Sequence, residues 1–361
     1  MPAPSTTVPV IASDAHLAHD GLVELVGGRE VPCYESPARA TRIRGALEAR
    51  GGYAVEAPTE HGLEPILAVH DHELVDLLEH AWADAMAAGG DPGRPLIPDT
   101  FLTRAYDAGM GLSTLPDRRH EALGAFCFDT ATPLVAGSYD AARGAVDVAL
   151  SAMGRVLGGA PLAYGLCRPP GHHASRGMFG GYCLFNNTAI VAERLLSMGA
   201  SRVAILDVDY HHGNGSRSIF WERPEVLYVS LHAHPRDAYP YFSGSADETG
   251  AGRGAGANRN LPLPRGTDGA AYATALTDAL AMIDDFDPDA PLVLSLGFDT
   301  FVDDPIGGFA LQTDDYGRLG SLVRGLGQGV VAIQEGGYAI EAIGANAVAF
   351  LDGLAGRGES V

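Results

Sequence analysis

The sequence contains no lysine, and all 24 of its basic residues are arginine. This absence excludes a Schiff base with a carbonyl substrate or pyridoxal phosphate, and it excludes the lysine of an ordinary P-loop nucleotide site. Cysteine is scarce too, because the 361 residues include only four, widely spaced and without a CxxC pair. We therefore expect neither a thiolate zinc knuckle nor a disulfide framework, and we predict reduced thiols.

Positive charge and long apolar runs are lacking as well. A net charge of −21 argues against binding to nucleic acid, which needs basic patches that release counterions. An acidic field attracts cationic substrates, although it also serves solubility alone. No apolar stretch reaches the roughly 20 residues that span a bilayer, and the first residues lack the basic and apolar regions of a signal peptide. We therefore expect no membrane contact and a cytoplasmic location.

Short apolar runs alternate with amphipathic segments from about residue 140 onward. Helical spacing marks four segments, residues 139–157, 187–198, 270–286 and 343–354. Five Val-, Leu- and Ile-rich runs between them are predicted strands, residues 162–167, 203–209, 226–231, 292–297 and 330–334. This order predicts an α/β fold whose parallel sheet is buried on both faces by helices. Because no repeat or composition break marks a linker, we expect one domain over residues 1–361.

Residues 86–124 differ from the rest of the chain. They are rich in Gly, Pro and Asp, weakly periodic, and too long for an ordinary connection. Two interpretations stay open at this point, a loop at the rim of a site or an oligomer contact on one side, and a disordered flap on the other.

Polar side chains follow the predicted strands, at the sheet edge where parallel α/β proteins bind ligands. Asp207, Asp209 and His211 lie at the end of one strand and just beyond it, and strand alternation predicts that they share a face. Asp299 follows another strand. Asp209, His211 and Asp299 form a set of three ligands that leaves positions for water and substrate, which is typical of a catalytic zinc site.

Two further features favour hydrolysis at such a metal. The tandem His172-His173 follows Pro-Pro-Gly at the end of a predicted strand, where adjacent imidazoles suit acid–base work on a bound water. Tyr338 follows two glycines, which predicts a phenol on a flexible loop, able to donate a hydrogen bond to a developing oxyanion.

Five motifs together resemble the histone deacetylase superfamily, and within it the bacterial acetylpolyamine amidohydrolases. They are RPPGHHA, DVDYHHGNG, YVSLH, SLGFDTF and EGGY, which begin at residues 168, 207, 228, 295 and 335. The resemblance runs from about residue 23 to 354. It implies a three-layer arginase/deacetylase fold with a central parallel sheet of about eight strands.

The resemblance assigns roles to the residues of these motifs. It implies that Asp209, His211 and Asp299 bind one zinc ion, that His172 and His173 are the acid–base pair, and that Tyr338 polarises the carbonyl. It also implies that Asp207 orients His172 and that Asn214 meets His173. A carboxylate partner favours the charged imidazolium and an amide does not, so His173 is better suited to act first as the general base.

A structural potassium ion is a second implied ligand. Its implied ligands are the side chain of Asp207, Ser230 Oγ, and the backbone carbonyls of Asp209, His211 and Leu231.

The substrate channel is implied by the same resemblance. Tyr182 and Tyr239 would sandwich an aliphatic chain, and Gly181 and Ile306 would complete the substrate site. Some polyamine-specific relatives carry rim glutamates at positions that fall near His120 and Ala131 here. Asp129 is our candidate for gripping a substrate amide or amine at the rim, with a turn or helix-cap carboxylate as the alternative interpretation.

The expected activity is zinc-dependent hydrolysis of acetylated polyamines or related small amines, giving acetate and free amine. The main alternative is an acetyl-lysine protein or peptide deacetylase. A non-catalytic metal sensor and a ureohydrolase are weaker alternatives, and Gly213 stands where the ureohydrolase pattern D-x-H-x-D needs its second carboxylate. The ligand types also accept iron(II) or cobalt. Relatives imply a homodimer formed through the segment at 86–124, which narrows the channel.

Overall fold

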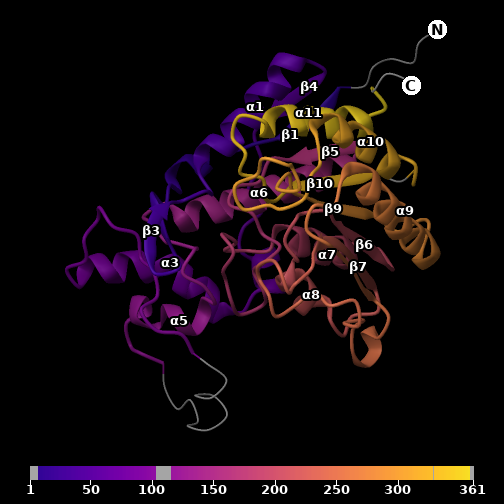
Figure 1. The fold of residues 1–361 in the computed structure, drawn as a ribbon. Helices are drawn as coiled ribbons and strands as arrows, with labels where there is room; N and C mark the ends of the chain where they lie inside the picture. The colour runs from indigo at the N-terminus through magenta and orange to yellow at the C-terminus, as the bar shows by residue number, and fades with distance from the viewer. Residues whose placement is uncertain (1–6, 103–114, 328, 358–361) are drawn as a thin grey trace.

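A computed structural model of the protein describes residues 7–102, 115–327 and 329–357 (Figure 1). Its central sheet has eight strands in the order β4-β1-β5-β10-β9-β6-β7-β8, and every pairing is parallel. The strands are β1 (Val8–Ile11), β4 (Tyr53–Glu56), β5 (Leu162–Gly165), β6 (Val203–Asp207), β7 (Val226–Ala233), β8 (Asn258–Leu263), β9 (Leu292–Leu296) and β10 (Val330–Gln334). The predicted fold class is therefore confirmed.

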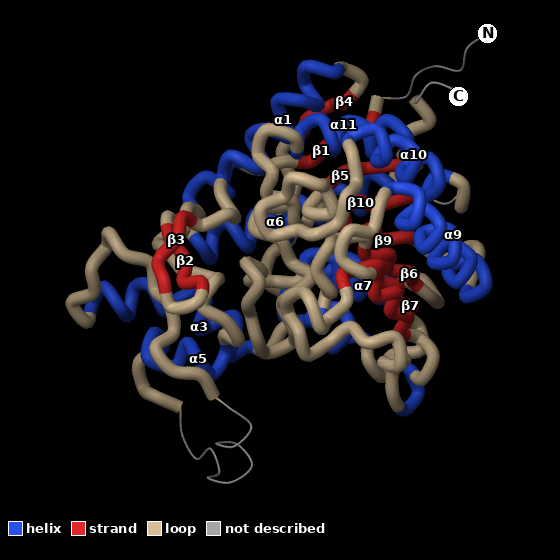
Figure 2. Tube along the Cα trace, viewed as in Figure 1, coloured by secondary structure: helices blue, strands red, loops and turns tan. Residues whose placement is uncertain are grey.

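A small antiparallel hairpin stands apart from this sheet (Figure 2). It consists of β2 (Val23–Val26) and β3 (Arg29–Pro32). Gly27 and Gly28 form its turn with positive φ angles of 57° and 77°, a backbone conformation that glycine adopts without steric cost.

Helices cover both faces of the central sheet because side chains alternate between the two faces along each strand. Val203 and Ile205 of β6 enter one hydrophobic core, whereas Ala204 and Leu206 enter the other. Four helices pack in the core that contains Ala204 and Leu206: α1 (Pro37–Arg50), α9 (Gly269–Phe286), α10 (Thr313–Arg324) and α11 (Ile343–Leu354). Four others pack in the core that contains Val203 and Ile205: α2 (Glu64–Val69), α3 (His72–Ala87), α6 (Ser138–Leu157) and α7 (Asn187–Ser197).

The remaining elements are short and lie in the connections. They are α5 (Leu123–Phe126), α8 (Asn214–Phe220) and the 3-10 turns η1 (Asp14–Ala18), η2 (Arg119–Ala122) and η3 (Gly252–Gly254). No helix among the described residues is both long and apolar enough to cross a membrane. The four cysteines are free thiols, and three of them are buried.

The five predicted strands are β5, β10, β9, β6 and β7, which are neighbours in the middle of the sheet. The four predicted helices agree with α6, α7, α9 and α11 to within one residue at each end. Strand ends were predicted less well, since β6 stops at Asp207 rather than 209 and β7 continues to Ala233 rather than stopping at 231. The longer β7 follows from its pairing with β8, which extends to Ala233 opposite Leu263.

The segment 86–124 is not structureless where it is described. Helix α3 runs to Ala87, and η2 and α5 occupy its far end. Leu96 pairs with Leu134 in an isolated bridge, which ties the segment to the body of the protein. Residues 103–114 lie outside the described residues.

The surroundings of two helical glycines predict that replacing them by alanine has opposite effects on the stability of the protein. A Cβ atom on the buried Gly320 would lie 2.1 Å from the carbonyl oxygen of Phe350, whereas Gly154 on the exposed side of α6 has open space. We expect Gly320→Ala to destabilise the protein by about 1–3 kcal/mol through overpacking, and Gly154→Ala to stabilise it by about 0.5–1 kcal/mol. Urea denaturation measures both, and equal stabilities would contradict this account of the helix contact.

Candidate active site

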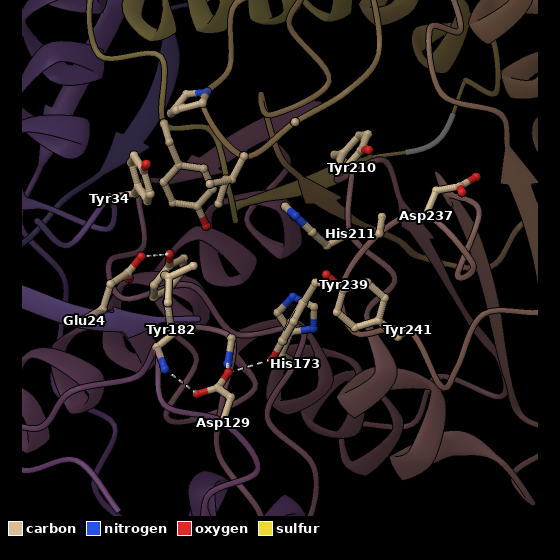
Figure 3. A pocket seen from close by; sticks show the side chains of 18 of the residues that line it. Glu24, Tyr34, Asp129, His173, Tyr182, Tyr210, His211, Asp237, Tyr239 and Tyr241 are labelled. Carbon is tan, nitrogen blue, oxygen red and sulfur yellow. Dashed lines mark hydrogen bonds between the residues drawn. The ribbon is translucent and has the colours of Figure 1, made fainter. Parts of the chain in front are cut away.

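Polar side chains from the carboxyl ends of the central strands gather around one cavity of about 400 Å³. Eight of the residues singled out in the sequence line it: Asp129, His173, Gly181, Tyr182, His211, Tyr239, Ile306 and Tyr338. Figure 3 shows Glu24, Tyr182 and Asp129 along one side, with Tyr210, His211 and Asp237 across from them. The cavity lies where the topology of a parallel sheet favours a ligand site.

The predicted metal ligands form a compact buried cluster. One potential ligand atom from each of Asp209, His211 and Asp299 lies within 4.8 Å of the other two. His211 Nδ1 is 2.9 Å from Asp299 Oδ2 and 3.4 Å from Asp209 Oδ1. Asp299 is 88 residues from His211 in sequence, and the two side chains meet because β6 and β9 are neighbours in the sheet.

The prediction that strand alternation aligns these residues is wrong, although the members of the cluster do meet. Strand β6 ends at Asp207, so Asp209 and His211 lie beyond it. Two successive turns hold them, because Asp207 accepts a hydrogen bond from the N–H of Asp209 (3.2 Å) and Asp209 from the N–H of His211 (2.9 Å). Aspartate favours such turns by bonding to backbone two residues ahead.

The charge balance of the cluster fits a divalent cation. Burial raises the pKa of Asp299 to about 7, and the negative charge of Asp209 adds to the rise. Burial lowers the pKa of His211, but its two carboxylate partners outweigh this effect and bring it to about 10. The three side chains thus share a proton. A metal ion bound by all three would replace this proton, which metal binding releases. Carboxylate and imidazole donors without sulfur suit a catalytic zinc site.

The two adjacent histidines differ because their partners differ. His172 Nδ1 lies 3.1 Å from Asp207 Oδ2, and His173 Nδ1 lies 2.7 Å from Asn214 Oδ1. Burial opposes the charged form of both rings. For His172 the carboxylates of Asp207 and Asp209 prevail and raise the pKa to about 10. For His173 burial and the neighbouring charge of His172 hold the pKa well below its ordinary value. His173 is therefore neutral and able to accept a proton.

Glu335 holds the loop that carries these histidines in place, a role that was not predicted from the sequence. Its Oε2 accepts hydrogen bonds from the N–H groups of Gly171 (2.6 Å) and His172 (3.1 Å), and its Oε1 accepts one from Ser295 Oγ (2.8 Å). Glu335 also lies with His172 and Cys183 in a second compact group of potential donors. Because both carboxylate oxygens are already bonded to the protein, we assign this group a structural role.

Tyr338 lies on a buried, fixed loop, which corrects the expectation of a flexible one. Its N–H donates to Asp304 Oδ2 (2.6 Å), and the guanidinium of Arg39 donates to the carbonyl oxygens of Gly337 (2.6 Å) and Glu335. The Arg39 guanidinium carbon also lies 4.6 Å from the centre of the Tyr338 ring. Burial holds the pKa of Tyr338 well above its ordinary value, so the phenol keeps its proton and remains a donor.

Both tyrosines predicted to form the channel have carboxylate partners. Tyr182 Oη donates to Glu24 Oε1 (3.1 Å), and Tyr239 Oη donates to Asp129 Oδ2 (2.7 Å). Glu24 is on β2, only 1% exposed, and its Oε2 has no hydrogen-bond partner among the described residues. Glu24 was not predicted as a site residue, because nothing in a short Val-Glu-Leu-Val strand shows that it reaches a distant cavity.

A donor set of this kind beside a buried imidazole of low pKa is typical of metal-dependent hydrolases. The histone deacetylase domain family model matches residues 33–354. Acetylpolyamine amidohydrolase 2 of Pseudomonas aeruginosa is 45% identical over 346 residues, which are 96% of this chain and 98% of that protein. The acetylpolyamine amidohydrolase of Mycoplana ramosa is 41% identical over 347 residues, 96% of this chain and 99% of that one.

A solved structure agrees with these sequence relatives. The crystal structure of an acetylpolyamine aminohydrolase from Burkholderia pseudomallei matches with a TM-score of 0.89 at 39% identity, and the match covers 97% of this chain and 99% of the other. The chain belongs to the histone deacetylase family, and it is a hydrolase of the deacetylase type.

The three-ligand cluster predicts stabilisation by added metal. Zinc at about 100 times its Kd should add about 2.7 kcal/mol to the free energy of unfolding of metal-stripped protein, which raises Tm. Asp299→Asn should abolish this rise, because it removes one anionic ligand. Asp278→Asn, on the exposed side of α9, is the matched control. A calorimetric scan with equal zinc-induced shifts in both variants would place the metal elsewhere.

Proposed function

We propose that this protein hydrolyses the amide bond of acetylated polyamines or related small amines, giving acetate and a free amine. The observation that carries the proposal is the convergence of a metal-ligand cluster, a neutral histidine and a protonated phenol on one cavity, beside the buried carboxyl group of Glu24. Relatives that cover nearly the whole chain carry the name acetylpolyamine amidohydrolase, which supports polyamines over acetyl-lysine peptides.

We assign the chemistry to named side chains. Asp209, His211 and Asp299 would hold a zinc ion, which when bound supplies a Lewis acid and lowers the pKa of a water ligand. His173, with its low pKa, takes the proton of the attacking water, and His172, paired with an aspartate, contributes positive charge.

The remaining steps stabilise charge and release the amine. The phenol of Tyr338 donates a hydrogen bond to the oxyanion of the tetrahedral intermediate. The protonated histidine then gives its proton to the nitrogen of the leaving amine, so that the free amine and acetate are formed.

Glu24 supports a cationic substrate. Burial raises the pKa of its carboxyl group to about 7, although the hydrogen bond from Tyr182 opposes the rise. An ammonium group in the channel would stabilise the ionised carboxylate, because an opposite charge in a poorly solvated place favours the charged form. A polyamine chain presents such a group a few methylenes from its acetylated end.

Four further assignments belong to this proposal. The domain extends over residues 1–361 with an insertion at about 86–124, the enzyme works in the cytoplasm, and it forms a homodimer through that insertion. A potassium ion binds near Asp207, Ser230 and Leu231. Asp207 and Ser230 are partners in the β6–β7 register, which supports a shared ligand between their side chains.

A substrate panel tests the proposed substrate class. Values of kcat/KM for acetylputrescine, acetylcadaverine and acetylspermidine should exceed that for an acetyl-lysine peptide.

Because Glu24 ionises as pH rises through about 7, KM for acetylputrescine should fall between pH 6 and 8, whereas KM for the uncharged N-butylacetamide should not follow this change. Glu24→Gln should remove the pH-dependent difference, and an unchanged profile in that variant would refute the role of Glu24.

Removing one hydroxyl group tests the oxyanion donor. Tyr338→Phe should lower kcat by roughly 10²–10³-fold, as for the loss of other oxyanion donors, while zinc content stays the same. Tyr164→Phe, which removes a buried hydroxyl bonded to Gln334 inside the core, controls for the loss of a hydroxyl away from the cavity. Full activity in Tyr338→Phe would remove this tyrosine from the mechanism.

A further inference from the structure

The carboxylate of Asp129 is fully occupied by the protein itself. Its Oδ2 accepts hydrogen bonds from the N–H of Gly181 (2.6 Å) and from Tyr239 Oη (2.7 Å). Its Oδ1 accepts hydrogen bonds from the N–H of Ala131 (3.1 Å) and from Thr132 Oγ1 (3.0 Å). A carboxylate has about four lone-pair sites, so these four bonds leave no acceptor position with which to grip a substrate.

These bonds join the two aromatic walls of the channel. Gly181 precedes Tyr182 in one wall, and Thr132 Oγ1, which donates to Asp129, accepts the N–H of Tyr182 (2.9 Å). Tyr239 forms the other wall. One side chain therefore holds both walls at the same point (Figure 3).

Tyr239 is held where it limits the space beside the proposed general base. Its ring meets the His173 ring edge-on, with centroids 5.1 Å apart and an interplanar angle of 88°. The Tyr239 ring also stacks on the Phe128 ring, with centroids 6.3 Å apart and an interplanar angle of 22°. Phe128 adjoins Asp129 in the chain, so one short segment positions Tyr239 by both stacking and a hydrogen bond.

The channel wall that contains Gly181 lies so close to His173 that it has little room to move. Gly181 has a φ of +58°, and a Cβ atom there would lie 2.2 Å from His173 Cδ2. The backbone of this wall thus already touches the imidazole. The width of the channel at His173 is set by how far Tyr239 stands from Gly181, and the Oδ2 atom of Asp129 binds both.

The geometry points to Asp129 as a positioning residue that sets the channel width through Tyr239 and so selects unbranched chains next to the scissile amide. This role rests on the amide hydrolysis proposed above, and it replaces our earlier interpretation of Asp129 as a group that binds the substrate. Releasing Tyr239 widens the channel, admitting a branched chain that the native channel excludes.

Competition between two substrates tests this role. One is acetylputrescine, and the other carries an added methyl group on the carbon next to the amide nitrogen. The ratio of their kcat/KM values measures discrimination, and it is independent of the folded fraction of a variant. Tyr239→Phe should lower the preference for the unbranched substrate about tenfold, as expected for one lost hydrogen bond to a charged acceptor. Asp129→Ala should lower it at least as much, and the double variant no further than Asp129→Ala.

The control is a second tyrosine–aspartate pair outside the cavity. Tyr53 Oη donates to Asp352 Oδ1 at 2.8 Å, and Tyr53→Phe should keep the native ratio. If Asp129→Ala raises KM for both substrates while the ratio stays native, Asp129 binds substrate and the positioning role is refuted. A native ratio in Tyr239→Phe refutes it as well.

A measurement without turnover separates this role from the proposed function. The imidazole proton resonance of His173 should shift in both Tyr239→Phe and Asp129→Ala, because the facing aromatic ring moves, and it should not shift in Tyr53→Phe. A wild-type enzyme that hydrolyses neither substrate would overturn the proposed function, while the resonance of His173 would still decide the positioning role. An unmoved resonance in both variants overturns it.

Discussion

Two carboxylates that share one buried site, Asp209 and Asp299, repel each other, and the neighbouring strand ends are arranged to keep them together. Gly336 N–H donates to Asp209 Oδ2 at 2.7 Å, and Tyr210 N–H donates to Asp299 Oδ1 at 2.9 Å. These bonds come from the ends of β10 and β6, on either side of β9. The adjacency of three central strands thus creates a concentrated negative charge that a cation relieves, and the histidines and phenol are placed around that point.

The same arrangement gives two neighbouring imidazoles different pKa values. His172 and His173 are consecutive in the chain, yet their partners, Asp207 and Asn214, come from the end of β6 and the start of α8. An anionic partner and a neutral one move the two pKa values in opposite directions. One ring is therefore charged and the other neutral, a distinction that depends on tertiary contacts and not on the residue type.

The centre of the fold and the site could be predicted from sequence, and their periphery could not. Apolar runs identified the five inner strands, because strands buried on both faces are rich in Val, Leu and Ile and carry few polar residues. The short edge strand β8 (Asn258–Leu263) contains proline, asparagine and arginine, and it is recognisable only through its pairing with β7. The residues of the candidate metal site were predicted by type and position, although turns, not strand alternation, bring them together.

The residues that were missed or reassigned share a dependence on distant partners. Glu24 lies on a hairpin far from the motifs, and its place in the cavity wall follows from the tertiary fold. Asp129 was identified correctly as a cavity residue, but its hydrogen-bond partners at Gly181 and Tyr239 come from two separate loops. A sequence motif indicates which side chains are present. Which of their lone pairs remain free to bind a ligand depends on neighbouring residues that only the tertiary fold brings together.

Arg39 connects the beginning of the chain to its end. This guanidinium, on the first long helix, holds the carbonyl oxygens on either side of Gly336, in the loop that carries Tyr338. During synthesis Arg39 is made almost 300 residues before that loop. A nascent or truncated polypeptide that lacks either segment cannot orient the phenol, so hydrolytic competence arises only when translation is nearly complete.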